Sequence, residues 1–188
     1  MTAPLYIALI HHPVFNARGE VVCTSITPVD LHDLARTAKT DGITKCLGVC
    51  PVQSQRRLAQ RIMDHWLTGI GAELNWTRKA AFERVALVES LQEARLTIEN
   101  DLGKPPRLVA TSAKGGPGRT GFAELRGLLA RAEAPHLFLF GTGWGMTDEV
   151  LAQADIFLEP IEGGGDGSYN HLPVRAAVAI ILDRLLSR

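Results

Sequence analysis

Residues suited to holding a small ligand gather directly after two buried runs in the carboxyl half of the chain. The first group follows the run 137–140 and alternates glycine with other residues: Gly141, Gly143 and Gly145. The second follows the run 156–158, and its segment 159–170 contains four further glycines. Glycine permits positive φ and lets a partner approach the main chain closely. Alone, the first group is also explained by a tight turn with Trp144 filling a surface groove, but two such segments on neighbouring strand ends predict a pocket.

A third glycine-rich segment, 111–120, lies between a predicted strand and a predicted helix and has the outline of a P-loop. The pattern fails twice, because Ala113 stands where the first glycine belongs and Arg119 stands where a lysine would reach the phosphates. A solvated connector is the simpler interpretation, and a nucleotide-phosphate enzyme remains an alternative. The first strand ends in His11-His12-Pro13 without a glycine-rich turn, which argues against a dinucleotide site.

The elements that position these loops alternate regularly between strand and helix. Apolar runs bounded by turn residues predict strands at 5–10, 43–49, 85–88, 108–110, 137–140 and 156–158. Helical periodicity predicts helices at about 28–41, 52–68, 90–102, 121–132, 146–153 and 172–187. We therefore expect an α/β fold with a mostly parallel sheet covered by helices on both faces. Ligands bind such sheets beyond the carboxyl ends of the strands, where the glycine-rich segments lie.

Composition bounds the remaining possibilities. The 188 residues are 46% hydrophobic and 21% charged, which predicts one globular domain over 1–188. Twenty basic and twenty acidic side chains give zero net charge, which excludes a strongly basic nucleic-acid-coating protein but not a local basic patch. Cys23, Cys46 and Cys50 lack the spacing of a metal site or disulfide framework, so we expect no metal and reduced thiols in the cytoplasm. No apolar run is long enough to cross a membrane.

Three segments, 27–38, 140–146 and 171–180, resemble the motifs of the SPOUT superfamily of AdoMet-dependent RNA methyltransferases. Within that superfamily the chain is most similar to a small bacterial group compared with the tRNA guanine-N1 methyltransferases. The resemblance implies a carboxyl-terminal trefoil knot, S-adenosyl-L-methionine as cofactor and an RNA substrate, either tRNA or rRNA. It also implies a homodimer in which the first motif of one subunit helps to complete the site of the other.

The chain departs from the superfamily pattern at three places. Asp30 and Pro173 stand where asparagines are common, and the second motif lacks its usual glutamate. The methyl acceptor therefore stays open between N1 of guanine and the ribose 2′-oxygen. A knotted module that binds AdoMet or RNA without transferring a methyl group is the alternative function.

The cofactor residues implied by these motifs surround the glycine-rich segments. AdoMet carries no phosphate, so its site needs an apolar slot with nearby main-chain donors and acceptors. We assign cofactor binding to Thr111, Phe140, Gly141, Gly143, Trp144, Gly145, Leu158, Pro160, Ile161, Asn170, His171 and Leu172.

Catalysis needs an aligned acceptor and, for an oxygen or ring nitrogen, removal of its proton. Arg36 occupies the arginine position of the first motif, where a permanent cation can orient a phosphate or stabilise developing negative charge. Asp166 is predicted to accept a proton from guanine N1, as the loop aspartate of the resembling group does. His32, one helical turn from Arg36, is a third candidate. A solvated helix and a turn-forming aspartate are the alternatives.

The predicted RNA-binding side chains are basic. Arg56, Arg57 and Arg61 cluster on one side of the predicted helix 52–68, and Lys114 and Arg119 supplement them. Because the net charge is zero, we expect modest RNA affinity that relies on RNA shape or on a partner.

Overall fold

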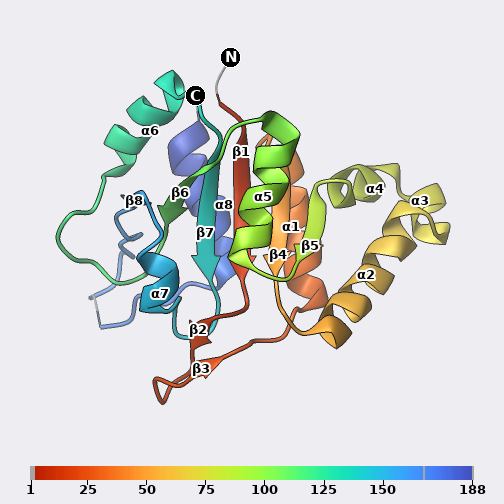
Figure 1. Ribbon diagram of the computed structural model, residues 1–188, viewed down its shortest axis with the longest axis horizontal. Coiled ribbons are helices and arrows are strands. Elements are labelled where there is room, and N and C mark those ends of the chain that lie inside the picture. The colour runs from red at the N-terminus through yellow and green to blue at the C-terminus, as the bar shows by residue number, and fades with distance from the viewer. Residues whose placement is uncertain (1–2, 167, 188) are drawn as a thin grey trace.

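The computed structural model describes residues 3–166 and 168–187. Its centre is a six-stranded, fully parallel sheet with the order β5-β4-β1-β7-β6-β8 (Figure 1). The strands are β1 (Leu5–Ile10), β4 (Lys45–Val49), β5 (Val85–Val88), β6 (Arg107–Ala110), β7 (His136–Gly141) and β8 (Ile156–Phe157). The predicted α/β class is confirmed.

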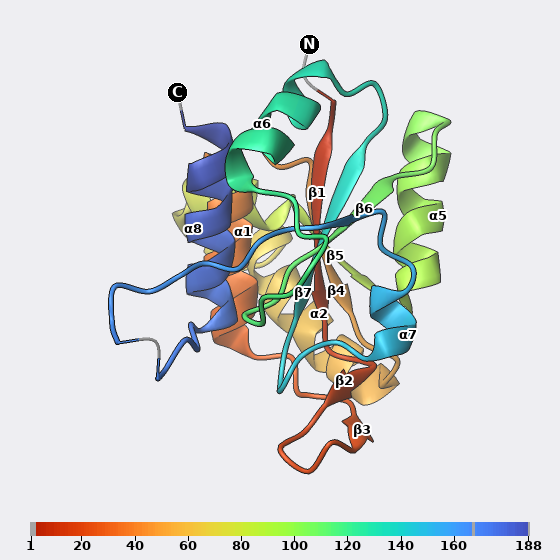
Figure 2. The same ribbon diagram turned by 90° about the vertical axis from the view of Figure 1, so that its left-hand side faces the viewer.

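Helices cover both faces of the sheet, as predicted (Figure 2). On one face α1 (Pro28–Thr40), α6 (Phe122–Arg131) and α8 (Val174–Leu186) contribute apolar side chains to one core cluster. On the other face α5 (Leu91–Leu102) and α7 (Asp148–Leu151) pack on a second cluster. Three consecutive helices lie beyond the β5 edge of the sheet in Figure 1: α2 (Gln53–Leu67), α3 (Ile70–Leu74) and α4 (Trp76–Phe82).

The start of α1 shows how local sequence sets an element. The Thr27 hydroxyl accepts a hydrogen bond from the Asp30 amide at 3.1 Å, and Pro28 occupies the first helical position. The helix ends just before Gly42, whose φ of +70° suits glycine. The first motif is therefore placed on a well-capped helix.

Two small features differ from the sequence prediction. A hairpin of β2 (Val14–Phe15) and β3 (Val21–Val22) follows β1, and α3 and α4 fill a region left without elements. Strands of two residues are too short to produce an alternation pattern, and α3 has only five residues. The hairpin matters below because it packs against a glycine-rich turn.

Across the described residues no helix is long and apolar enough to cross a membrane. In the same residues no group of three or more His, Cys, Asp or Glu side chains is arranged to hold a metal ion. The trefoil knot implied by the resemblance stays a prediction.

Candidate functional site

Three loops meet at the carboxyl edge of the sheet because β7, β6 and β8 are neighbours there. They are the segments 111–120, 141–147 and 158–173. The Thr120 amide donates to the Phe157 carbonyl at 2.7 Å, which joins the first loop to β8. β6 lies between β7 and β8, and the segments 141–147 and 158–173 approach each other at the Trp144 and His171 rings, whose centroids are 6.4 Å apart. The pocket that the sequence predicts between these two segments stays a prediction.

The segment 141–145, called the glycine turn below, is held by the β2–β3 hairpin. Gly143 has φ of +58°, and a Cβ there would lie 2.7 Å from the Phe15 carbonyl oxygen. The Trp144 amide donates to that same carbonyl at 2.8 Å, and the Phe15 amide donates to the Gly145 carbonyl at 2.9 Å. The group that approaches the main chain closely at Gly143 is therefore the Phe15 carbonyl of the same chain.

A row of side-chain hydrogen bonds anchors the same turn to the end of β1. The Thr142 hydroxyl donates to the Ile10 carbonyl at 3.0 Å, so the Thr24 hydroxyl must donate to Thr142, at 2.6 Å. His11 Nδ1 lies 3.0 Å from the Thr24 oxygen and therefore carries the proton. Burial lowers the pKa of His11 to about 4, only partly opposed by the charge of Asp30, so the ring is neutral near pH 7.

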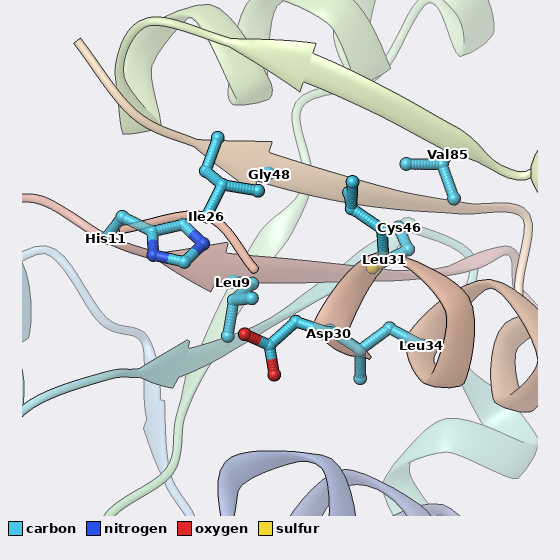
Figure 3. A pocket seen from close by; sticks show the side chains of 9 residues that line it. All are labelled: Leu9, His11, Ile26, Asp30, Leu31, Leu34, Cys46, Gly48 and Val85. Carbon is cyan, nitrogen blue, oxygen red and sulfur yellow. The ribbon is translucent and has the colours of Figure 1, made fainter. Parts of the chain in front are cut away.

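The other nitrogen of this ring faces a small pocket (Figure 3). His11 Nε2 has no hydrogen-bond partner among the described residues, and in this tautomer it is an acceptor. The Asp30 carboxylate lines the same pocket and accepts from the Thr27 hydroxyl at 2.6 Å. Burial raises the pKa of the Cys46 thiol, a further lining group, to about 12. The remaining lining residues are Leu9, Ile26, Leu31, Leu34, Gly48 and Val85.

The segment 159–173, called the glycine loop below, is held by fewer contacts. The Asn170 side chain accepts from the Gly163 amide at 3.3 Å and donates to the Ile161 carbonyl at 2.9 Å. At Gly164 and Gly165 a Cβ would meet no atom within 4 Å. Gly164 and Gly165 therefore stand in open space, whereas a Cβ at Gly163 would lie 3.6 Å from Asn170 Oδ1.

Asp166 lies on the exposed part of the glycine loop. Its carboxylate accepts from the Ser168 hydroxyl at 2.6 Å and from the Ser168 amide at 2.9 Å. These bonds, the hydroxyl bond foremost, lower the pKa of Asp166 below its ordinary value. The side chain is therefore ionised near neutral pH, and the same bonds make it a weaker proton acceptor than a carboxylate without them.

Arg36 lines an open groove between α1 and the start of α8, together with Pro173, Ala176 and Ala179. Its guanidinium forms no ion pair with any described carboxylate. Arg175 also lines this groove, but it pairs with Asp33 at 3.0 Å and reaches Asp30 at 3.7 Å. Arg36 thus has no ion-pair partner among the described residues, although the Asp33 and Asp41 carboxylates line the same groove.

The predicted cofactor residues divide into exposed and buried sets. Trp144 is 62% exposed, Leu172 is 44% exposed and His171 is also exposed. Phe140 and Leu158 are buried in the core. Thr111 is also buried, and its hydroxyl donates to the Leu139 carbonyl at 2.8 Å. A third group is partly exposed: Gly141, Gly145, Pro160, Ile161 and Asn170. The buried members can offer a ligand only their main-chain groups.

His32 is turned away from the groove that contains Arg36. Its ring packs edge-on against Trp66 and Phe82, with centroids 5.4 and 4.9 Å away, and Nδ1 contacts the Arg78 guanidinium. Burial, then the Arg78 charge, lowers the pKa of His32. The structure therefore does not bring His32 together with the glycine-rich segments.

Two of the five predicted RNA-binding side chains take part in the fold. Arg56 donates to the Cys50 carbonyl at 2.6 Å and forms an ion pair with Glu89. Arg119 lies over the Phe157 ring, 5.4 Å from its centroid, and donates to the Lys114 carbonyl at 3.1 Å. The side chains of Arg57, Arg61 and Lys114 are exposed.

Sequence reasoning missed the network of Thr24 and Thr142 and the ion pairs of Arg175. Thr142 stood between two singled-out glycines, and Arg175 lay within the third motif. The signals were therefore present, but the partners lie far away in the sequence and only the fold identifies them.

The glycine turn leaves its main chain accessible to a ligand at one position. At Gly145, with φ of +109°, a Cβ would meet no atom within 4 Å, so a ligand has room to approach the main chain. Ile161 is a partly buried apolar residue on the neighbouring segment. Accessible main chain beside apolar residues is what a nucleoside without phosphates needs, and a slot between the two segments stays a prediction.

Solved structures first define the class of protein. The SpoU methyltransferase AviRb from Streptomyces viridochromogenes, in complex with AdoMet, matches at TM-score 0.59 and 16% identity, covering 99% of this chain and 58% of that one. An rRNA methyltransferase from Sinorhizobium meliloti matches at TM-score 0.57 and 16% identity, covering 98% and 56%. These likenesses show a SPOUT methyltransferase fold.

The sequence then gives the family. A family model described as SAM-dependent RNA methyltransferase matches residues 4–187, and the chain belongs to that family. An Aquifex aeolicus protein is 41% identical over 184 residues, covering 98% of this chain and 89% of that protein. A tRNA (guanine-N(1)-)-methyltransferase of Oleidesulfovibrio alaskensis is 42% identical over 182 residues, covering 97% of this chain and 42% of that protein. The chain thus spans about two-fifths of the length of this relative.

Proposed function

We propose that the protein methylates a base nitrogen of tRNA, with N1 of guanine as the acceptor, and binds AdoMet between the glycine turn and the glycine loop. The observation that supports this acceptor is the 42% and 41% identity to two proteins named tRNA (guanine-N(1)-)-methyltransferase. The open space beside the main chain at Gly145 supports the cofactor position.

Each proposed residue has one role in the transfer. AdoMet, when bound, supplies an electrophilic methyl group. The Asp166 carboxylate would take the proton from guanine N1, and the N1 electron pair would form the new bond to the methyl carbon. The carbon–sulfur bond of AdoMet would break in the same step, with its electron pair left on the sulfur of the departing S-adenosylhomocysteine. The Arg36 guanidinium holds a phosphate of the RNA or stabilises negative charge that develops on the base. Arg57, Arg61 and Lys114 would contact the RNA backbone further out.

A homodimer would complete this site. Ala176 and Ala179 are small residues that line the groove beside Arg36, so a second copy could approach α8 closely. Light scattering should then give a mass near 41 kDa, twice the chain mass of 20.4 kDa. A stable, active monomer would contradict the dimer and any site shared between subunits.

A tRNA substrate and three free cysteines support a cytoplasmic protein.

The decisive experiment is transfer of a labelled methyl group from AdoMet to unmodified tRNA transcripts, followed by mass spectrometry of the nucleosides. We expect N1-methylguanosine. A 2′-O-methylated nucleoside would identify the ribose acceptor instead. AdoMet binding in calorimetry without any methyl incorporation into these transcripts, or into RNA from cells lacking the gene, would support the non-catalytic module.

Arg36→Ala separates catalysis from cofactor binding. We expect this variant to lose transfer while AdoMet affinity stays nearly unchanged, because Arg36 comes from α1 and the cofactor segments come from the carboxyl half. Arg131→Ala, an exposed arginine in the last turn of α6, is the matched control and should behave like the wild type. A large loss of AdoMet binding in Arg36→Ala would mean that Arg36 lines the cofactor slot.

A further inference from the structure

Three aromatic rings stand together at the outer rim of the candidate site. Trp144 of the glycine turn is 62% exposed, and Tyr169 of the glycine loop is 75% exposed. The exposed His171 ring lies between them, with its centroid 6.4 Å from that of Trp144 and 5.2 Å from that of Tyr169. Large aromatic side chains are normally well covered in a folded protein, so rings left open to water mark an interaction surface.

The main chain holds these rings in position. The Trp144 amide donates to the Phe15 carbonyl at 2.8 Å, in the part of the turn that the hairpin fixes. Asn170, between Tyr169 and His171, closes the glycine loop through its two side-chain hydrogen bonds. Trp144 is therefore presented by a turn that the hairpin fixes, which lowers the entropic cost of using it for binding, whereas Tyr169 and His171 lie on the more adaptable glycine loop.

The chain leads from the aromatic rim to the groove between α1 and α8. Pro173, two residues after His171, lines that groove, and so does Arg36. Arg36 has no ion pair with a described carboxylate, whereas Arg175 is paired with Asp33. Exposed aromatic rings and an unpaired guanidinium are the groups that bind unpaired RNA, because bases stack on the rings and phosphates meet the cation. Arg36 shares its groove with Asp33 and Asp41 as well as Arg175.

We propose that Trp144, Tyr169 and His171 form a stacking platform for an unpaired RNA base beside the cofactor site, with a neighbouring phosphate at Arg36. This inference rests on the proposed RNA methyltransferase function. An enzyme that methylates a base must take it out of its stack, and a ring platform compensates for the contacts that the base loses. The side chains of Trp144 and His171 then serve the RNA, while their main chain remains part of the cofactor segments.

The test compares RNA and AdoMet affinities of ring variants. The probes are a fluorescently labelled 12-nucleotide single-stranded RNA and a duplex of the same sequence. For Tyr169→Leu and Trp144→Leu we expect single-strand affinity to fall about 10- to 100-fold, the usual loss for one stacked base. Tyr169→Phe should recover most of that loss because it keeps the ring. Leu96→Ala, at an exposed position of α5 on the opposite face of the sheet, is the control with wild-type affinity.

Each other outcome contradicts the platform in a different way. Unchanged RNA affinity in both leucine variants would show that the rings do not stack a base. Loss of AdoMet affinity in Tyr169→Leu, measured by calorimetry, would show that the ring covers the cofactor, and a lowered molecular mass would show that it contacts a second copy. If Trp144→Leu fails to fold, Tyr169→Leu on the other segment decides the question.

The experiment distinguishes failure of the platform from failure of the proposed methyltransferase function. If the wild type methylates tRNA and both leucine variants keep the wild-type KM for tRNA, the proposed function stands and the platform is contradicted. A wild type that binds single-stranded RNA through the rings but transfers no methyl group keeps the platform and loses the proposed activity.

Discussion

The glycine turn and the glycine loop share a composition but differ in what their glycines do. In the turn, Gly143 is required by its positive φ and by the Phe15 carbonyl 2.7 Å from its missing Cβ. In the loop, Gly164 and Gly165 have no neighbour within 4 Å at that position. The turn is therefore preorganised by the hairpin, whereas the loop has freedom that a ligand can remove. A cluster of glycines in a sequence can thus mark either a fixed close approach or an open, adaptable segment.

The largest expected effect is on the glycine turn. Gly143→Ala should lower the free energy of unfolding by about 4 kcal/mol, since the left-handed backbone and the close contact with Phe15 are each expected to cost about 1–3 kcal/mol. Urea unfolding followed by circular dichroism measures the change. Gly164→Ala is the matched control and should stay within about 0.5 kcal/mol of the wild type. Equal effects of the two substitutions would remove the distinction between the segments.

The second prediction concerns the histidine that anchors the turn. The pKa of His11 is about 4 in the folded protein and near 6.5 unfolded, so the unfolded state binds the extra proton between these values. Stability should therefore fall by on the order of 3 kcal/mol as the pH drops from 6.5 to 4, and this part should level off below pH 4. The lowered pKa values of His32 and His136 add slope in the same direction.

His11→Asn isolates this contribution, because an amide at the Nδ1 position can still donate to Thr24. Its unfolding free energy, measured from pH 4 to pH 7, should show a shallower slope than that of the wild type. A slope identical to the wild-type slope would show that His11 does not titrate in this range.

A smaller effect is expected at the hydroxyl that joins the turn to β1. Thr142→Val removes the bonds to Ile10 and Thr24 and should cost about 1 kcal/mol, while Thr142→Ser should retain most of the stability. AdoMet affinity should fall with the same substitution, because the turn loses its anchor. Thermal unfolding and calorimetry measure the two effects, and a fully stable Thr142→Val would contradict the anchoring role.

The smallest stability effect belongs to the glycine loop. Asn170→Ala removes two bonds that only shape the loop, so stability should change by less than about 0.5 kcal/mol. AdoMet affinity should nevertheless fall about tenfold, the equivalent of one hydrogen bond lost in the bound state. A large loss of stability without a change in affinity would reverse the assignment of the two segments.

Local signals account for most of the fold that could be predicted from the sequence. The Thr27 cap and Pro28 start α1 where predicted, and β5 spans the predicted residues Val85–Val88. The hairpin and α3 were missed because two-residue strands and a five-residue helix leave almost no periodic pattern.

The candidate site was predictable in place but not in detail. Parallel strands bring their carboxyl ends together, so the convergence of the glycine-rich segments followed from the class of fold. The contact of Gly143 with Phe15 and the pairing of Arg56 with Glu89 join distant parts of the chain. No local pattern records such partners, and the orientation of His32 toward Trp66 likewise depends on how α1 packs.

Hydrogen–deuterium exchange with and without AdoMet tests most directly whether the cofactor binds between the two segments. The account predicts that amides of 141–145 are already protected in the free protein and change little, whereas amides of 159–172 become clearly slower to exchange when AdoMet is added. Protection confined to 111–120, or no change in 159–172 at saturating AdoMet, would contradict it.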